Sequence, residues 1–571
     1  MPRRAGRPSG LTRAPAAGTL APVSRDAPLD QIEFGLLGTL NARSRRRLAE
    51  RLTVHALRAG DWLFREGEPG DRMFVVRSGR LDVVSEEDGD VLRRIGRGEV
   101  VGELALLTGS PRSASVRAHR DSELLAVARE DFDDLLRKDE EFALALMRAI
   151  GEKLRVSVAR ADPSGQPDRV IALAGAPDPR IVADLTAAMA AGERVACLDA
   201  DAAGVPDDWA AALERAEREH DRVLLVVGDD DEWSAFCLRQ ADRTVLFARP
   251  DGPVARDAAL RGCDLAWLAR PGDGVLLVPW VAALQPSRRH LLLVGHLDAG
   301  IHRMARRLAG RAVGLVLSGG GARALCHIGV LDALAEADVV VDRVGGCSMG
   351  ALIGALYALG RSPDEIAERC HEELVRKRPF NDYTVPRVAL IRSRKARRML
   401  ERVFAGRRIE ELERDYFCVS ADLVAAEPVV HRSGPLWEAV GASMSLPGLV
   451  PPVVAGDRLL VDGGVLDNFP VEVMAAGAEG PIVAVDAMGR RPLGGAGGPP
   501  PLLETLARAT VLSSWQAAAM SRALADVLVV PDPGEVGMLA FERLDELRAA
   551  GRASAVSSLA EWNFARSAAP V

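Results

Sequence analysis

The chain has 571 residues, 48% of them hydrophobic and 27% charged, and its 73 basic and 80 acidic residues give a formal net charge of −7. That length suffices for about three to four domains that each bury a core. The acidic balance argues against a nucleic-acid partner, and no apolar run approaches the roughly 18 residues of a membrane-spanning helix.

The seven cysteines are scattered without CxxC or Cys/His spacing. This distribution predicts reduced thiols, no metal site and a cytoplasmic protein. Contact with a membrane would then be peripheral.

The first part of the chain divides into a tail and a glycine-punctuated block. Residues 1–28 are rich in Pro, Ala, Gly and Arg without periodicity, which predicts a disordered tail. Residues 29–157 open with a helical pattern over 41–57. Short apolar runs separated by glycines follow, at 62–64, 73–76, 81–84 and 124–127, before helical patterns at 129–137 and 140–156. Short strands at this spacing predict an antiparallel β-roll or barrel.

Two α/β regions follow. In residues 168–300, apolar runs alternate with helical patterns, and this rhythm predicts a parallel sheet. A GxGxxG fingerprint is missing there, so no dinucleotide cofactor is expected. Residues 311–535 contain strand-like runs at 313–317, 339–344, 417–421 and 482–486 and helical patterns at 322–337 and 349–359. Residues 536–571 are expected to form a C-terminal helical segment.

The segment Val101-Gly-Glu-Leu-Ala-Leu-Leu-Thr-Gly-Ser-Pro-Arg-Ser-Ala-Ser115 carries chemistry suited to a nucleotide. Arg112 can pair with a phosphate through its guanidinium, and Glu103 can accept from a ribose hydroxyl. Their spacing, after glycine-punctuated strands, resembles the phosphate-binding cassette of cyclic-nucleotide-binding domains. An aromatic residue is usual in that family where this chain has Val101.

The resemblance implies cyclic AMP or cyclic GMP as a regulatory ligand. Glu103 would hold the ribose and Arg112 the cyclic phosphate. Ser113 would lie beside the base and phosphate, and backbone groups would come from Gly102, Leu104 and Ala105. The alternative is a β-roll that binds no nucleotide and serves as an interaction module.

Two glycine-rich motifs lie in the last α/β region. Gly314-Leu-Val-Leu-Ser-Gly-Gly-Gly-Ala-Arg323 is a strand that ends in three glycines before a helix. Converging backbone N–H groups at such a turn suit an oxyanion hole, whereas a P-loop would need a Gly-Lys-Ser/Thr ending. Gly346-Cys-Ser-Met-Gly350 is a G-x-S-x-G elbow between a strand and a helix, which makes Ser348 a candidate nucleophile.

The base that would activate Ser348 has more than one candidate. A strand delivers Asp462 into Asp462-Gly-Gly464, and all nine histidines precede residue 432. The usual Ser, Asp/Glu, His order therefore cannot place a histidine after Asp462. A conventional triad would recruit His371 or His431 with an earlier acid such as Asp422. A Ser348–Asp462 dyad fits the order better.

These motifs together resemble the patatin-like phospholipases. The segment Ala442-Ser-Met-Ser-Leu-Pro-Gly-Leu-Val-Pro-Pro452 also looks like that family's region ahead of the aspartate. The resemblance implies a three-layer α/β/α hydrolase with Ser348 as nucleophile and Asp462 as general base. It also implies an elbow framed by Gly346 and Gly350, and an oxyanion loop of Gly319, Gly320, Gly321, Ala322 and Arg323. Ala324 departs from the glycine that is frequent in the family.

The order of the regions resembles one branch of that family. A cyclic-nucleotide-like roll, an α/β middle region and a patatin domain are similar to the neuropathy target esterase group of lysophospholipases. The middle region's Cys237-Leu-Arg-Gln-Ala-Asp-Arg243 supports this resemblance. It implies a phospholipid or lysophospholipid substrate and no required cofactor.

Several groups of residues have two interpretations. Arg303, Arg306, Arg307 and Arg311 are either a solvated helix face or a contact for anionic lipid head groups, and the same holds for the basic residues between 392 and 398. Trp437, Met444 and residues 446–453 either line an acyl pocket or pack in the core. Cys347 and His327 are interpreted as packing residues.

Three functions remain open from the sequence. The first is a serine esterase acting on phospholipids or lysophospholipids through Ser348 and Asp462. The second is a nucleotide-responsive binding protein with a silent hydrolase domain. The third is an α/β-hydrolase with a Ser-His-Asp triad that uses His431. The oligomeric state does not follow from the sequence.

Overall fold

The computed structural model describes residues 21–22, 40–86, 91–159, 168–257, 260–270, 272–385, 387–488, 502–534 and 536–568. Most of the predicted tail lies outside these residues. The chain forms two compact units. The first comprises residues up to 172 with 198–219 and 228–242; the second comprises 173–197, 220–227 and 243–571.

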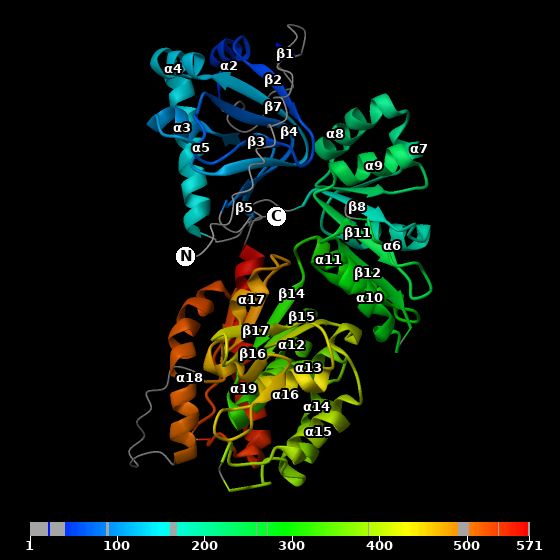
Figure 1. Ribbon diagram of the computed structural model, residues 1–571, viewed down its shortest axis with the longest axis vertical. Helices are drawn as coiled ribbons and strands as arrows, with labels where there is room; N and C mark the ends of the chain where they lie inside the picture. Colours follow the sequence, from blue (N-terminus) through cyan, green and yellow to red (C-terminus); the bar gives the residue numbers. More distant parts are fainter. Residues whose placement is uncertain are drawn as a thin grey trace, which may run out of the picture. The chain divides into compact units, whose positions relative to one another are not determined.

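The first unit is built around an antiparallel β-roll, as the sequence predicts (Figure 1). Its sheet has the order β1-β2-β7-β4-β5, with β3 paired to β7 and β6 to β4. The strands are β1 (Ala21–Pro22), β2 (Thr53–Leu57), β3 (Trp62–Phe64), β4 (Arg72–Val84), β5 (Val91–Ile95), β6 (Val100–Val101) and β7 (Ser115–Ala128). The helices are α2 (Ala42–Ala49), α3 (Glu103–Thr108), α4 (Arg129–Lys138) and α5 (Glu140–Ala159).

The roll corrects one expected element. The helix predicted over 41–57 ends at Ala49, and residues 53–57 form β2, which pairs with β7. The three-residue spacing of Val54 and Leu57 suits a helix, but pairing with β7 makes residues 53–57 a strand. The runs at 73–76 and 81–84 belong to one strand, β4, whose pairing with β7 shifts register around Gly79.

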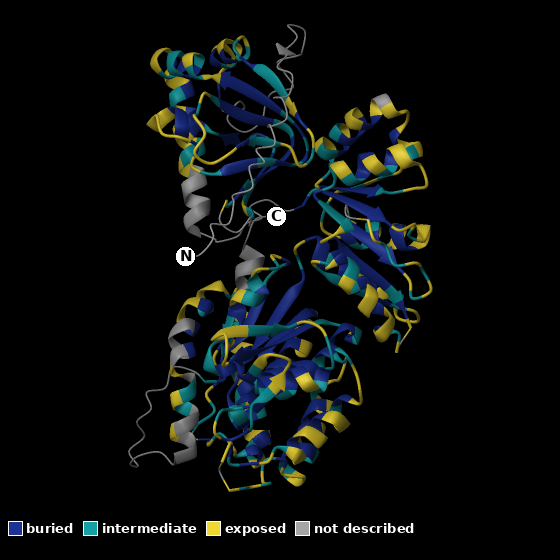
Figure 2. Ribbon diagram, viewed as in Figure 1, coloured by how far each residue is buried: buried dark blue, intermediate teal, exposed yellow. Residues whose placement is uncertain are grey.

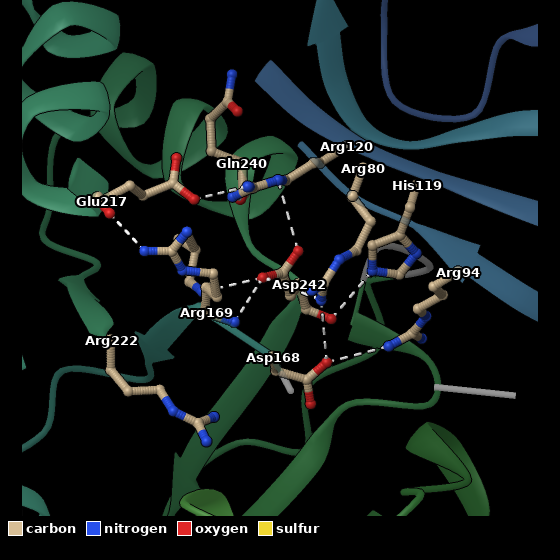
Figure 3. Close-up of polar contacts among 12 residues, drawn as sticks. Arg80, Arg94, His119, Arg120, Asp168, Arg169, Glu217, Arg222, Gln240 and Asp242 are labelled. Atoms are coloured by element: carbon tan, nitrogen blue, oxygen red, sulfur yellow. Dashed lines mark hydrogen bonds and ion pairs between the residues drawn. The ribbon is translucent and has the colours of Figure 1, made fainter. Parts of the chain in front are cut away.

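Three further helices complete the first unit: α7 (Ala200–Ala203), α8 (Trp209–Glu219) and α9 (Asp231–Gln240). Within this unit, the carboxylate of Asp242 is fully buried beside two arginines of the roll (Figure 3). Its oxygens lie 3.3 Å from Arg80 Nη1 and 3.5 Å from Arg120 Nε, and the backbone N–H of Arg169 donates to the carboxylate at 2.7 Å. Burial alone would raise the pKa of Asp242, but Arg120 and Arg80 outweigh it and hold the pKa at about 2.

The second unit contains most of a sheet with the order β13-β12-β11-β8-β10-β9. Strands β11 (Arg243–Ala248), β12 (Asp264–Ala269) and β13 (Arg289–Leu293) pair in parallel, as the alternating pattern predicts. The other strands are β8 (Val170–Ala174), β9 (Val195–Leu198) and β10 (Arg222–Val226). The helices of this region are α6 (Pro179–Ala190), α10 (Gly274–Leu284) and α11 (Leu297–Leu308).

The same unit contains a mixed sheet with the order β18-β19-β16-β15-β14-β20-β21, with β17 paired to β16. Strands β14, β15, β16, β20 and β21 run parallel to one another. Strands β17 and β19 each pair antiparallel with β16, and β18 pairs antiparallel with β19. Their bounds are β14 (Val313–Leu317), β15 (Val341–Cys347), β16 (Asp415–Asp422), β17 (Glu427–His431), β18 (Val453–Ala455), β19 (Arg458–Asp462), β20 (Ile482–Val485) and β21 (Val527–Val529).

Both faces of this sheet are covered by helices, which gives the expected three layers (Figure 1). Leu315 and Leu317 of β14 pack with one group of helices, and Val316 points to the other face. The first group includes α12 (Cys326–Glu336), α13 (Met349–Ala358), α14 (Pro363–Cys370), α15 (Arg394–Phe404), α16 (Leu436–Ser443) and α19 (Leu544–Ala568); the second includes α17 (Val471–Ala475) and α18 (Leu502–Ser521).

The C-terminal helix α19 packs closely on α12. A Cβ on Gly551 would lie 1.9 Å from the carbonyl oxygen of Cys326, so the two helix backbones meet where only glycine fits. Leu547 and Leu559 are buried in the same core cluster as α12 and α13. Because α12 follows the glycine loop, α19 helps to fix that loop in place.

Candidate functional site

The turn between β15 and α13 holds Ser348 in a strained conformation. Ser348 has φ of 53° and ψ of −121°, a region that non-glycine residues rarely adopt. A Cβ on Gly350 would lie 2.3 Å from the carbonyl oxygen of Leu317, so the backbones of α13 and β14 touch there. Such a nucleophile elbow presents the serine hydroxyl at the carboxyl edge of the sheet.

Strand register brings Asp462 to the same edge. Cys347 pairs with Val419 across β15 and β16, and Ser420 pairs with Asp462 across β16 and β19. The hydroxyl of Ser348 donates to Oδ2 of Asp462 at 2.7 Å. Asp462 is only 4% exposed, and this burial raises the pKa of its carboxyl group to about 6. A carboxylate with that pKa is suited to accept a proton near neutral pH.

Some backbone N–H groups of the glycine loop donate to carbonyl groups of the protein, and others belong to residues that line the pocket. The N–H of Gly319 donates to the carbonyl of Asn468 at 3.3 Å, and the N–H of Ala322 donates to that of Met538 at 2.8 Å. Gly320 and Gly321 line the pocket beside Ser348, as does Met349. The N–H of Met349 lies in the first turn of α13, where it has no partner within the helix. These three residues are therefore the candidate oxyanion donors. Met349 is an addition to the sequence-based set.

The predicted helix after the loop begins later than expected. Residues 321–325 form the 3₁₀ helix η4, and α12 starts at Cys326. Two anchors explain this local geometry: Ala322 donates to Met538, and Nε of Arg323 donates to the carbonyl of Val536 at 2.7 Å. The side chain of Arg323 thus anchors the glycine loop to Val536.

Ser443, which sequence reasoning missed, and Cys347, which it interpreted as a packing residue, both contact the reacting pair. The hydroxyl of Ser443 accepts from the backbone N–H of Ser348 at 2.9 Å and donates to the carbonyl of Val419 at 2.7 Å. The thiol of Cys347 lies 3.7 Å from Oδ1 of Asp462, which also accepts from the N–H of Gly464 at 2.8 Å. The only available signal was that Ser443 lies in the patatin-like segment 442–452.

A pocket of about 250 Å³ opens over Ser348 and Asp462. Its walls are mainly apolar, and Arg508 is the only basic residue among the described residues that line it. The rings of Phe380 and Phe541 stack with centroids 5.9 Å apart on one wall. The other apolar lining residues are Met349, Met444, Leu446, Leu449, Val450, Met488, Met538 and Leu539. The sequence left pocket and core open for Trp437, Met444 and residues 446–453. Met444, Leu446, Leu449 and Val450 line this pocket, and Leu449 and Val450 are also buried in a cluster with Ile391. Trp437 lies under the guanidinium of Arg397.

The residues of the alternative triad lie elsewhere. Nε2 of His431 is 2.7 Å from the hydroxyl of Ser420, and burial lowers the pKa of His431 to about 4. The carboxylate of Asp422 accepts from the N–H groups of Val424 and Leu459. His371 is exposed at the start of η5 (His371–Arg376). The geometry thus gives Ser348 a carboxylate partner and not an imidazole.

The interpretation of His327 as a packing residue agrees with its surroundings. Its Nε2 lies 2.8 Å from the carbonyl oxygen of Ser318, and its ring is fully buried in α12. Burial lowers the pKa of His327 to about 4. The ring therefore supports the end of β14, just before the glycine loop.

In the first unit, the cassette residues surround a buried arginine. Arg112 is 4% exposed, and its guanidinium donates to the carbonyls of Gly102 and Arg72 at 3.0 and 2.8 Å and lies over the ring of Phe64. Glu103 is also buried. The remaining cassette residues differ in exposure: Ala105 is buried, and Leu104 and Ser113 are exposed.

Two of the four arginines of the predicted basic face, both in α11, are paired with acids. Arg306 pairs bidentately with Asp342 at 2.9 and 2.7 Å, and buried Arg307 pairs with Glu479 and Asp415. The expectation of a solvated or lipid-contacting face is therefore wrong for Arg307, which is buried, while Asp342 neutralises the half-buried Arg306. Among the described residues, no group of three or more His, Cys, Asp or Glu side chains could hold a metal ion. No helix in the described ranges is long and apolar enough to cross a membrane.

Comparisons with known proteins agree with this organisation. The sequence model of the patatin-like phospholipases matches residues 315–475, and that of the cyclic nucleotide-binding domain matches residues 54–139. An uncharacterized NTE family protein of Mycobacterium tuberculosis is 35% identical over 564 residues, which cover 92% of this chain and 95% of that protein.

Two longer proteins are similar over part of their length. Lysophospholipase NTE1 of Cryptococcus neoformans is 28% identical over 75% of this chain and 32% of its own length. Patatin-like phospholipase domain-containing protein 6 of Homo sapiens is 28% identical over 76% of this chain and 37% of its own length. The resemblance found in the sequence is thereby confirmed.

Proposed function

Because this chain belongs to the NTE family, we propose that it is a serine esterase that removes acyl chains from lysophospholipids or phospholipids. The observation that carries this proposal is the 2.7 Å hydrogen bond from the Ser348 hydroxyl to Asp462 at the floor of an apolar pocket. A buried carboxylate in contact with a strained serine is the arrangement that a two-residue mechanism needs.

The proposed reaction proceeds in two halves. Asp462 takes the hydroxyl proton as the Ser348 oxygen attacks the ester carbonyl carbon. The N–H groups of Gly320, Gly321 and Met349 stabilise the negative charge on the carbonyl oxygen. Collapse of this intermediate breaks the ester bond, and Asp462 returns the proton to the leaving alcohol. Asp462 then deprotonates a water molecule that cleaves the acyl-enzyme and restores the Ser348 hydroxyl.

The lining of the pocket favours a lipid that carries a phosphate. Apolar walls accept an acyl chain, and the guanidinium of Arg508 matches the geometry of a phosphate group. In a glycerophospholipid only the glycerol backbone separates the ester from the phosphate. Both groups can therefore lie in one pocket, with the carbonyl at Ser348 and the phosphate toward Arg508.

The test compares two substrates with the same acyl chain, lysophosphatidylcholine and monoacylglycerol. Ser348→Ala is expected to abolish hydrolysis of both. Arg508→Gln is expected to lower kcat/KM for the lysophospholipid by roughly 10- to 100-fold, which corresponds to the loss of one hydrogen bond to a charged group. For the neutral ester, kcat/KM should fall by less than about threefold. Arg361→Gln, an exposed arginine outside the pocket, is the matched control. Equal losses on both substrates would contradict phosphate recognition, and an inactive wild type would contradict the esterase.

We also propose that the roll binds cyclic AMP or cyclic GMP through the cassette, as a regulatory ligand. The match to the cyclic nucleotide-binding domain supports this, as does the position of Arg112 against the backbone of Gly102. To hold a phosphate, the guanidinium would exchange the carbonyls of Gly102 and Arg72 for phosphate oxygens. Calorimetry should detect binding by the wild type and not by Arg112→Ala; a wild type that gives no heat would contradict the proposal.

A further inference from the structure

One surface of the second unit combines exposed apolar side chains with basic ones. Tyr383, Val385 and Val388 are 68%, 78% and 71% exposed in the segment before α15 (Figure 2). Six exposed basic residues follow or flank them, at positions 387, 392, 394, 395, 397 and 398. We call residues 383–398, with Pro386 left aside, the 383–398 face.

The base of this face is part of the pocket wall. Ile391 is fully buried in a cluster with Leu449 and Val450, and its N–H donates to the carbonyl of Leu449 at 3.0 Å. The N–H of Leu390 donates to the carbonyl of Gly448 at 2.9 Å. Leu449 and Val450 line the pocket over Ser348, as does Phe380, which lies just before the face. The exposed tip is therefore tied directly to the site.

Charge on the face is opposite to that of the whole chain. Residues 383–398 contain six basic and no acidic residues, whereas the chain carries a net charge of −7. Helix α15 buries Ala396, Met399, Leu400 and Phe404 and leaves its arginines and lysine outside. A small apolar tip flanked by long cationic side chains suits the boundary between anionic head groups and acyl chains. Tyrosine is also enriched at that depth of a bilayer.

We propose that the 383–398 face docks the enzyme on an anionic lipid surface, with Tyr383, Val385 and Val388 inserted among the head groups. This inference rests on the proposed function, since it supplies the route by which a membrane lipid reaches Ser348. Docking brings the pocket wall at residues 446–450 against the bilayer, so the lipid leaves the membrane beside the pocket that receives it.

The test measures cosedimentation of the full chain with vesicles of phosphatidylcholine, with and without about one third phosphatidylglycerol. The tip variant Y383S/V385S/V388S and the charge variant R394Q/K395Q/R398Q are compared with the control V424S/V454S, which replaces valines that are 70% and 74% exposed elsewhere on the same unit. Each basic residue near an anionic surface contributes roughly fivefold to binding. The charge variant should therefore lose on the order of 100-fold on anionic vesicles, and the loss should shrink in high salt.

The tip variant should lose at least about tenfold on anionic vesicles, and the control should bind like the wild type. Hydrolysis is followed in parallel with vesicle-embedded lipid and with a soluble short-chain ester. A selective loss on vesicles supports docking. Equal binding by the wild type and both variants would overturn the docking proposal. A wild type that does not bind vesicles yet hydrolyses the soluble ester would also overturn it. A wild type that binds vesicles through this face and hydrolyses neither substrate would instead refute the proposed function.

Discussion

Replacing Asp462 with asparagine should make the protein more stable while it removes the activity. The carboxyl group is buried and its pKa is raised to about 6 from an ordinary value of 3.8. The folded state therefore favours the protonated form. The stability that this group contributes is fully present below its ordinary pKa and is lost as the pH rises through about 6.

The size of the effect follows from that difference in pKa. About 1.4 kcal/mol for each pH unit gives a cost of about 3 kcal/mol at pH 8 and about 1 kcal/mol at pH 4.5. Asparagine stays neutral, can accept from Gly464, and can donate to the hydroxyl of Ser348. The variant should therefore unfold on the order of 5 °C above the wild type at pH 8, with a smaller difference at pH 4.5. Its activity should fall about 10²- to 10⁴-fold through loss of the base.

Differential scanning calorimetry at the two pH values and a kinetic assay at pH 8 test this prediction. Asp467→Asn is a matched control, because burial also raises the pKa of Asp467 to about 6 and its side chain accepts from Phe469 rather than from Ser348. That control should gain similar stability and keep most of the activity. An Asp462→Asn variant with an unchanged or lower Tm at pH 8, or with a pH-independent gain, would refute the reasoning.

Further predictions concern the pH profile, the elbow and the first unit. In the wild type, kcat/KM should rise with pH through about 6 as Asp462 ionises; a profile flat from pH 5 to 8 would exclude it as the base. Ser443→Ala removes the acceptor for the Ser348 N–H and should lower kcat about 10-fold with little change in KM, whereas Ser443→Thr should restore part of it in the same kinetic assay. Gly350→Ala forces a Cβ onto the carbonyl of Leu317 and should abolish labelling by a serine-directed probe. Asp242→Ala removes the fully buried carboxylate that Arg80 and Arg120 share, although Arg80 keeps Asp168 and Arg120 keeps Glu217, and should destabilise the first unit by about 3 kcal/mol, seen as a lower Tm; a shift below about 1 °C would contradict the role of this ion pair.

The motifs with a local geometric cause could be predicted from the sequence. The strand at 313–317 matches β14 residue for residue, because a short apolar run before glycines suits a strand buried on both faces. The elbow at Ser348 could also be predicted, because the G-x-S-x-G motif lies between a strand pattern and a helix pattern. Asp462 could be selected because no histidine follows it.

The remaining features depend on partners that are distant in the sequence. The sequence predicted a basic surface at Arg306 and Arg307. Their acidic partners, Asp342 and Glu479, are distant in the sequence and lie beside them only in the folded chain. Ser443 and Cys347 contact the reacting pair through the register of β15, β16 and β19, which no local pattern fixes. The prediction of a helix over 41–57 was wrong beyond Ala49, because residues 53–57 pair with β7, which lies far away in the sequence.

The most direct test of the Ser348–Asp462 assignment is fluorophosphonate labelling followed by peptide mass spectrometry. The wild type should carry one adduct on Ser348, and His431→Ala should carry the same adduct at a comparable rate. Ser348→Ala should carry none, and Asp462→Asn should react at least about 100-fold more slowly. A His431→Ala variant that fails to react beside an Asp462→Asn variant that reacts normally would contradict the dyad and favour a histidine-based triad.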